Sequence, residues 1–280
     1  MRSRTRSGDG AAPDRPVGSL HPDIRERELA RKQDQMGKSE SRIPAIMRML
    51  GRVSDTCREA SSVALVGCGP CPDALMDLID LGYRAVGVEP VGEYARAAAN
   101  YVGHNAIVLK GSAEQLPLAD GSQVAVILES VLEHVDSVPK SLSEAHRVLV
   151  PGGMVYIKTT NRLMLTNGEF TSRLYQWYPR LVKESFVYRH LHHDPRLARY
   201  TSRPAVHWFT FSELCDLGRD SGFAAFYSAL DLLEPNDPEV ARYPFVASIL
   251  TACSRSAWLR SLALTQQPGS IIVMERRRAP

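Results

Sequence analysis

The sequence has no apolar run of the about 18–20 residues that a membrane-spanning helix needs. The nearest candidate, residues 245–264, is interrupted by Ser254, Arg255 and Arg260, and it predicts an amphipathic helix instead. The first ten residues, MRSRTRSGDG, have no apolar segment, which argues against a secretory signal. We therefore expect no membrane span.

Cysteine is scarce and scattered, which argues against a disulfide framework. The five cysteines are Cys57, Cys68, Cys71, Cys215 and Cys253. Cys68 and Cys71 form a C-x-x-C pair, but no second pair completes a zinc site. The histidines near residue 190 match no ligand spacing either, so no metal is expected. Reduced thiols favour a cytoplasmic protein.

A strong excess of one charge is also missing. Residues 1–60 hold thirteen Lys and Arg against nine Asp and Glu, while the remaining 220 residues hold 21 against 22. This balance gives no general field for a polyanion, so nucleic acid is not the expected partner. The expected partner is a small-molecule substrate, and a homodimer stays open.

From residue 62 onward, apolar strands alternate with segments of helical periodicity. The expected strands are 63–66, 84–90, 106–111, 124–130, 154–160, 223–233 and 267–277; the expected helices are 74–82, 91–100, 137–149 and 209–222, with Ser212 as the N-cap of the last, and a helical stretch over 239–264. This alternation is typical of βαβ units. It predicts an α/β fold with a doubly wound, Rossmann-like, mostly parallel seven-stranded sheet whose last strand is antiparallel.

The same pattern divides the chain. A disordered tail is expected over 1–20, an N-terminal helical cap over 21–60, the cofactor-binding core over 61–160, a lid or substrate insertion over 161–206, and the C-terminal part of the core over 207–280.

The segment VALVGCGPCPDAL, residues 63–75, runs from a strand through Gly67-Cys68-Gly69 into a helix. Glycines let the backbone turn sharply and approach a ligand, and the helix N-terminus offers free N–H groups. Glu89 ends the next strand twenty residues after Gly69, where a carboxylate can accept hydrogen bonds from ribose hydroxyls. This spacing predicts an adenosine cofactor. A dinucleotide fingerprint would need glycine at the position of Pro72.

Two further segments, GSAEQLPLADGSQVAVILESVLEHV (111–135) and LSEAHRVLVPGGMVYIKTTNR (142–162), resemble class I S-adenosylmethionine-dependent methyltransferases of the type-11 group, which includes ubiquinone-pathway O-methyltransferases. The resemblance covers about residues 60–162 and resumes at 207–223. It implies a methyltransferase with S-adenosylmethionine as cofactor.

The resemblance also implies roles for single residues. The cofactor-binding residues would be Gly67, Cys68, Gly69 and Pro70 under the methionine and ribose, Glu89 and Pro90 at the ribose and adenine, Ser112, Ala113 and Glu114 along the adenine edge, and Glu129 and Ser130 at the methionine. His134 would lie near the transferred methyl group, and His207 would line the substrate pocket. For an O-methylation these two histidines are the candidate bases, although His134 is as readily a structural residue. Glu133 is expected to be solvated or to cap a helix.

Three positions depart from the family pattern: Leu65 replaces an acid, Cys71 a common glycine and Ser112 a common acid. They leave open a non-catalytic partner subunit that binds the cofactor. An RNA or protein methyltransferase also stays open, although ESVLEHV differs from the N/D-P-P-Y/F tetrad of base-amine methyltransferases.

The insertion is where we expect specificity. Residues 170–211 hold ten of the twenty aromatic residues, and residues 173–203 hold seven Lys and Arg against two Asp and Glu. Arginine suits phosphate and carboxylate groups. The insertion is therefore interpreted either as a small helical subdomain with a solvated basic face or as a lid over an aromatic or isoprenoid substrate with an anionic group, two readings that are compatible.

Overall fold

The computed structural model describes residues 42–59, 61–70, 72–164, 174–194, 196–197, 205–265 and 270–277. The predicted tail, most of the predicted N-terminal cap and Cys71 lie outside the described residues.

One sheet of seven strands organises the chain, in the order β3-β2-β1-β4-β5-β7-β6. The strands are β1 (Ser62–Val66), β2 (Arg84–Glu89), β3 (Ile107–Lys110), β4 (Gln123–Glu129), β5 (Leu149–Thr159), β6 (Phe223–Ser228) and β7 (Ser270–Arg276). All neighbours pair in parallel except β7, which is antiparallel to both β5 and β6. The predicted fold class is therefore confirmed, and β7 lies between two strands of the opposite direction.

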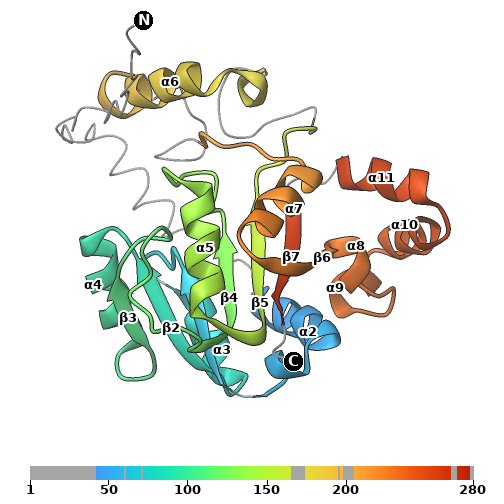
Figure 1. Ribbon diagram of the computed structural model, residues 1–280, viewed down its shortest axis with the longest axis horizontal. Coiled ribbons are helices and arrows are strands. Elements are labelled where there is room, and N and C mark those ends of the chain that lie inside the picture. Colours follow the sequence, from blue (N-terminus) through green and yellow to red (C-terminus); the bar gives the residue numbers. More distant parts are fainter. Residues whose placement is uncertain are drawn as a thin grey trace, which may run out of the picture.

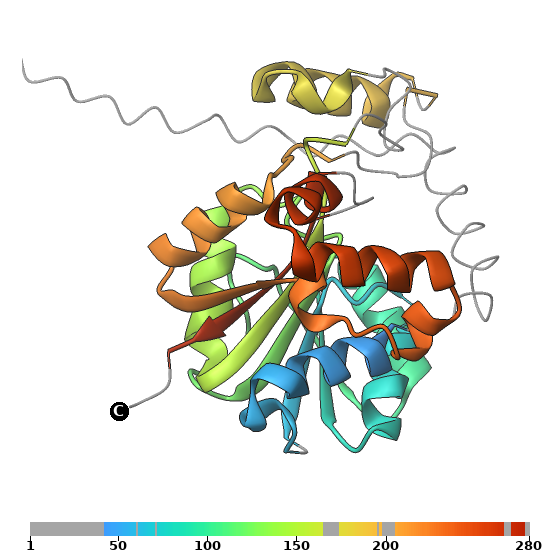
Figure 2. The ribbon, with the colours of Figure 1, turned by 90° about the vertical axis from the view of Figure 1, so that its right-hand side faces the viewer.

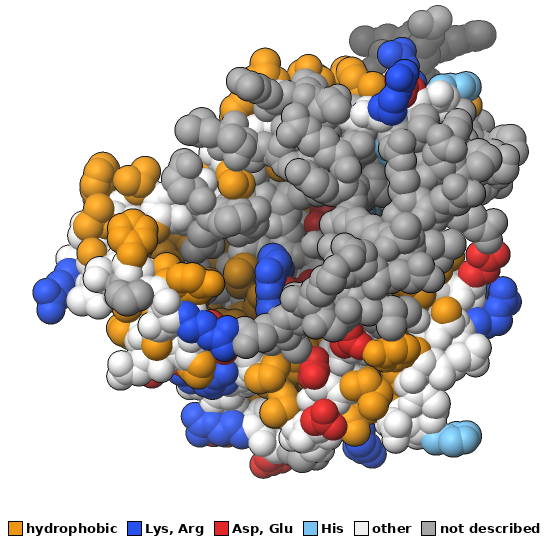
Figure 3. Space-filling view, turned by 180° about the vertical axis from the view of Figure 1, so that it is seen from behind, with side chains coloured by type: hydrophobic (Ala, Val, Ile, Leu, Met, Phe, Trp, Pro, Cys, Tyr) orange, Lys and Arg blue, Asp and Glu red, His pale blue; other side chains and the backbone are white. Residues whose placement is uncertain are grey.

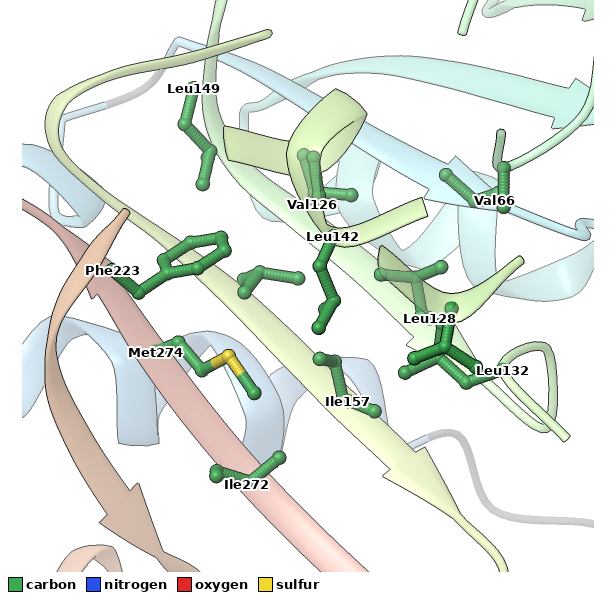
Figure 4. Close-up of a cluster of buried hydrophobic side chains, with 14 of the residues drawn as sticks. Val66, Val126, Leu128, Leu132, Leu142, Leu149, Ile157, Phe223, Ile272 and Met274 are labelled. Carbon is green, nitrogen blue, oxygen red and sulfur yellow. The ribbon is translucent and has the colours of Figure 1, made fainter. Parts of the chain in front are cut away.

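Helices cover both faces of the sheet (Figure 1). On one face lie α2 (Ile43–Val53), α3 (Asp73–Asp80), α4 (Gly92–Val102) and α8 (Ala229–Leu232); on the other lie α5 (Val138–Val148) and α7 (Phe211–Asp220). Neighbouring residues of a strand point to opposite faces. Val126 and Leu128 accordingly belong to the apolar cluster under α5 and α7 (Figure 4), whereas Ala125 and Ile127 belong to the cluster under α2 and α3. Both faces being covered explains the continuous apolar runs.

Three local expectations were wrong. The sixth strand ends at Ser228, because the Ser228 and Asp231 side chains form a capping box that begins α8. The N-cap of α7 is Thr210 and not Ser212, because Thr210 accepts from the Glu213 N–H and Glu213 accepts from the Thr210 N–H. The fifth strand begins at Leu149 and not at residue 154, so residues 151–153 lie within β5, where a register shift and a positive φ of 78° at Gly152 make an irregular strand start.

The remaining elements are the 3₁₀ turns η1 (Asp55–Cys57) and η2 (Tyr175–Trp177) and the helices α6 (Arg180–His192), α9 (Pro238–Ala241), α10 (Pro244–Arg255) and α11 (Ala257–Thr265). The single amphipathic helix expected near 245–264 is thus two helices that meet at Ser256. Helix α6 lies above the end of the sheet where β4 and β5 terminate (Figures 1 and 2). Helix α10 packs against α8, α9 and α11, and apolar side chains gather on this side of the surface (Figures 1 and 3). Phe245 of α10 and Trp258 of α11 are exposed. Within the described ranges, no helix is long and apolar enough to span a bilayer.

Candidate active site

The carboxyl ends of β1, β2 and β4 meet at the point where the strand order reverses. Val66 of β1 pairs with Val88 of β2 and with Leu128 of β4, so the residues that follow these strands are neighbours. Ligands of open α/β sheets bind at such a switch point. The sequence-predicted residues that follow the three strands are therefore brought together here.

The loop after β1 is bent at two glycines. Gly67 has a φ of +71° and Gly69 a φ of +68°, a region that favours glycine. A Cβ atom on Gly67 would come 2.8 Å from the Cγ2 methyl of Val131, whereas a Cβ atom on Gly69 would meet no atom within 4 Å. The first glycine thus lets the loops after β1 and β4 pack together, and the second borders open space. This open, Cβ-free rim fits a ligand that lies against the backbone.

Glu89 holds this loop from the end of β2. Its side chain is only 5% exposed, and its two carboxylate oxygens accept hydrogen bonds from the Gly69 N–H at 2.9 Å and the Val91 N–H at 3.0 Å. A carboxylate offers about four acceptor positions, so two remain for hydroxyl donors. Pro90 follows at an exposed position.

The Cys68 thiol packs against β2 and is not reactive. Its sulfur would lie 3.0 Å from a Cβ atom on Gly87, so the thiol fills the space against β2. Burial, with the nearby charge of Glu89, raises the pKa of the Cys68 thiol to about 12. The thiol is therefore protonated at neutral pH, and it acts here as a small packed side chain.

The segment after β3 lies beside the loop after β2. Ser112 forms a bridge with Gln115, and Ala113 is buried in the apolar cluster under α5. The Glu114 carboxylate accepts hydrogen bonds from the Asp136 N–H at 2.8 Å and the Ser137 N–H at 3.5 Å. Burial alone would raise the pKa of Glu114, but these N–H groups lower it. Glu114 thus ties this segment to the start of α5.

Glu129 and Ser130 end β4. The Glu129 carboxylate lies 3.5 Å from the Arg42 guanidinium and 3.9 Å from the Lys158 ammonium. Burial raises the pKa of Glu129, and the charge of Arg42 opposes this. Ser130 has a φ of +55°, and it is the one described residue other than glycine in the left-handed region. Its N–H donates to the Lys158 carbonyl at 2.8 Å, which fixes this strained backbone.

The loop after β4 carries His134 and meets His207. The carbonyl of Glu133 accepts hydrogen bonds from the Val206 N–H at 2.8 Å and the His207 N–H at 3.1 Å. His134, half-buried, donates its own N–H to Val131 in a turn. Both candidate histidines therefore lie on one loop system, 73 residues apart in sequence.

The expectation for Glu133 was wrong. Its side chain is only 4% exposed, and its carboxylate accepts a hydrogen bond from the Thr159 hydroxyl at 2.7 Å. Glu133 therefore joins the loop after β4 to the end of β5 and to residues 206–207. Sequence spacing gave no signal of this, because the partners lie 26 and 73 residues away.

The surroundings of His207 disfavour the protonated form of its ring. Its Nε2 atom lies 2.8 Å from the Val135 carbonyl, and the ring stacks on Phe209 with centroids 6.1 Å apart. Burial, then the charges of Arg180 and Lys183, lowers the pKa of His207, although the Val135 carbonyl opposes this. An Nε2–H that donates to Val135 leaves Nδ1 as the basic atom.

His207 lines a hollow of about 640 Å³ between α6, residues 206–209 and α7. Its charged lining residues are Arg162, Arg180, Lys183, Glu213, Asp216 and Asp220. The insertion was predicted to supply such a surface, but Lys183 was not singled out. Among the described residues, no three His, Cys, Asp or Glu side chains are grouped closely enough to hold a metal ion.

Comparison with known proteins relates this sheet to a protein family. Residues 65–157 match the family described as a methyltransferase domain, of the type-11 group. The chain carries a methyltransferase domain. This match contains the end of β1, all of β2, β3 and β4, and most of β5, with the glycine loop and Glu89.

A known relative supports the same assignment. A probable S-adenosylmethionine-dependent methyltransferase of Mycolicibacterium smegmatis is 34% identical over 107 residues, which cover 38% of this chain and 40% of that protein. The chain thus spans about two fifths of the length of this curated relative. The resemblance predicted from the sequence, the enzyme class and the cofactor S-adenosylmethionine are confirmed for this domain.

The fold also matches solved methyltransferases. The S-adenosylmethionine-dependent methyltransferase of Mesorhizobium loti has a TM-score of 0.55 at 16% identity, covering 85% of this chain and 99% of that one. Phosphoethanolamine N-methyltransferase 2 of Haemonchus contortus, in complex with S-adenosyl-L-methionine, has a TM-score of 0.52 at 14% identity, covering 85% of this chain and 52% of that one.

Proposed function

We propose that the chain transfers a methyl group from S-adenosylmethionine to a small-molecule acceptor. The observation that carries this proposal is the Glu89 carboxylate, buried beside the glycine loop at the switch point, with two acceptor positions left for the ribose hydroxyls. When bound, S-adenosylmethionine supplies a methyl group that its sulfonium already activates.

The residues at the switch point fit this cofactor. Gly67 to Pro70 would lie under it, because the rim at Gly69 is open, and Pro90 and residues 112–114 would border the adenine. Glu129 and Ser130 would face the charged methionine end, since Glu129 is the acid at the end of β4. Leu65, a departure from the family pattern, is buried in the apolar cluster under α2 and α3 and so lies away from the open rim.

The chain's own contribution to methyl transfer is to orient the acceptor and exclude water. Holding two reactants in line can supply about 7–11 kcal/mol of the barrier in favourable cases. For a hydroxyl acceptor, a base must also remove a proton, and His134 is the first candidate and His207 the second. The lowered pKa of His207 supports this, because it favours the unprotonated ring and only an unprotonated nitrogen accepts a proton.

For the acceptor, we propose an aromatic or isoprenoid compound with an anionic group, covered by residues 161–206. The aromatic and basic side chains of the hollow beside α6 support this. An RNA or protein acceptor is the alternative, as is a cofactor-binding subunit without catalysis. A cytoplasmic location, a homodimer and the domain boundaries stay predictions from the sequence.

The test is calorimetric titration with S-adenosylmethionine and S-adenosylhomocysteine, with Glu89→Ala as the control variant. Micromolar binding that Glu89→Ala abolishes supports the proposal and justifies a methyl-transfer screen weighted toward anionic aromatics and isoprenoids. Absence of binding to either ligand would refute it. Tight binding with no turnover on any acceptor, and a stable complex with a second protein, would favour the non-catalytic subunit.

A further inference from the structure

The hollow between α6, residues 206–209 and α7 is separate from the rim at the switch point. None of the residues that we assign to the cofactor lines it. Its volume of about 640 Å³ lies in the range of small-molecule sites, about 300–1,000 Å³. Aromatic side chains form much of its wall: Trp177, Tyr178, Trp208 and Phe209.

Lys183 of α6 is the unusual residue of this hollow. It is only 6% exposed, and its ammonium forms no hydrogen bond or ion pair with any residue that the structure describes. Its ammonium lies 6.0 Å from the centre of the Trp208 ring. Lysine is almost never buried without a partner, because removing an ammonium from water costs several kcal/mol. Burial, followed by the charge of Arg162, lowers the pKa of Lys183 to about 8.

Helix α6 turns Lys183 inward and leaves apolar residues exposed. Lys183, Val187 and His190 are its buried residues, at spacings of four and three that define one helix face. Leu181 and Tyr188, in contrast, are 79% and 50% exposed. A helix that only packs against a core would bury its apolar residues and expose its lysine. The face of α6 that turns inward is therefore suited to a polar ligand.

The other charges of the hollow are largely neutralised within the protein. Arg162 pairs with Glu213 at 2.5 Å, Arg180 with Glu184 at 2.7 Å, and Asp216 with Arg219 at 2.6 Å. Asp220 lies at an exposed position at the end of α7. Lys183 is thus the buried charge of the hollow that lacks a counter-ion among the described residues.

We propose that this hollow binds the carboxylate or phosphate group of an aromatic or apolar ligand, with Lys183 as its counter-ion. The cation lies beside Trp208, and Trp177 and Tyr178 supply apolar surface for the rest of the ligand. Identifying this ligand with the methyl acceptor rests on the proposed function, whereas anion binding at Lys183 does not.

Tryptophan fluorescence can report this binding. Trp177 and Trp208 line the hollow, and the third tryptophan, Trp258, lies on α11 and is 70% exposed. In a Trp258→Phe background, phenyl phosphate, benzoate and benzyl alcohol are titrated at constant ionic strength. We expect a saturable change with one of the anions, at a concentration about tenfold or more below that of the neutral alcohol. The better anion distinguishes phosphate from carboxylate.

The decisive variant is Lys183→Met, which keeps an unbranched apolar side chain one atom shorter and removes the charge. We expect it to weaken the anion by about tenfold or more, and to keep or raise the melting temperature because an unpaired buried charge is removed. Arg189→Met, at an exposed position of the same helix, is the matched control and should change the affinity by less than about twofold. Equal affinity in Lys183→Met and the parent, or no saturable binding of either anion, would overturn the proposal.

Titration of the same variants with S-adenosylhomocysteine separates this proposal from the proposed function. Lys183→Met should bind it as the parent does, since Lys183 lies outside the rim. Anion binding without S-adenosylhomocysteine binding would refute the methyltransferase proposal and leave the Lys183 site standing. The reverse result would refute the Lys183 site alone.

Discussion

Alanine substitutions at three glycines with positive φ can distinguish the effect of backbone strain from the effect on ligand binding. Gly67, Gly69 and Gly82 have φ values of +71°, +68° and +88°. Alanine in this region costs about 1–2 kcal/mol. At Gly67 the new methyl group would also come 2.8 Å from Val131, and such overpacking typically adds about 1–3 kcal/mol. At Gly69 and Gly82 there is open space, so only the strain remains.

We therefore expect urea unfolding to show a loss of about 1–2 kcal/mol in Gly69→Ala and Gly82→Ala and of about 2–5 kcal/mol in Gly67→Ala. Calorimetry should then separate the two mild variants. Gly69→Ala places a methyl group on the rim where the cofactor is expected, so S-adenosylhomocysteine should bind about tenfold or more weakly. Gly82 lies after α3, away from the rim, so Gly82→Ala should bind as the parent does.

Unchanged affinity in a folded Gly69→Ala variant would refute the argument that the open space beside this glycine belongs to the cofactor. An equal loss of affinity in Gly82→Ala would refute it as well, because the effect would then come from strain and not from the rim.

Three further substitutions test single contacts. Glu89→Gln should lower the free energy of unfolding by about 1.5–3 kcal/mol, because the two N–H groups donate to different carboxylate oxygens and the amide NH2 that replaces one of them cannot accept; chemical denaturation measures this. Thr210→Ala removes the N-cap of α7 and should cost about 1 kcal/mol in the same assay, with Ser254→Ala, an exposed substitution in the last turn of α10, as its control. Hydrogen bonds from Arg52 hold the pKa of Asp237 below its usual value, so the stability that Asp237 contributes is present above about pH 4 and is lost as the pH falls further. Asp237→Asn should therefore destabilise the protein at pH 7 by about 2 kcal/mol and flatten the pH dependence of its urea midpoint below pH 4; an unchanged slope would contradict this assignment.

Local pattern predicted most of the elements because the central strands β1, β4 and β5 are covered on both faces. Segments such as Val63–Val66 then consist of apolar residues only, and a turn or a glycine ends them. Helix starts were harder to predict, because several Ser and Thr residues near 210 could cap α7, and the choice of Thr210 depends on Glu213 lying three residues later.

The candidate site also contains features that the sequence predicted and features that it did not. Glu89 and the glycine loop were predicted together because both act through the backbone geometry of one βαβ unit. The contact of His207 with Val135, the burial of Glu133 and the inward face of α6 could not be predicted. Each depends on how residues 205–209 and α6 lie over the end of β4.

The sequence by itself determined the class of the fold and the pairing of a glycine loop with an acid at the end of the next strand, because these depend on periodicity and on spacings within about thirty residues. Only the tertiary structure decided that β7 enters between β5 and β6, that the loop after β4 holds the segment before α7, and that Lys183 points inward. The physical reason is that burial and counter-ions are properties of neighbours in space, and the neighbours of these residues come from distant parts of the chain.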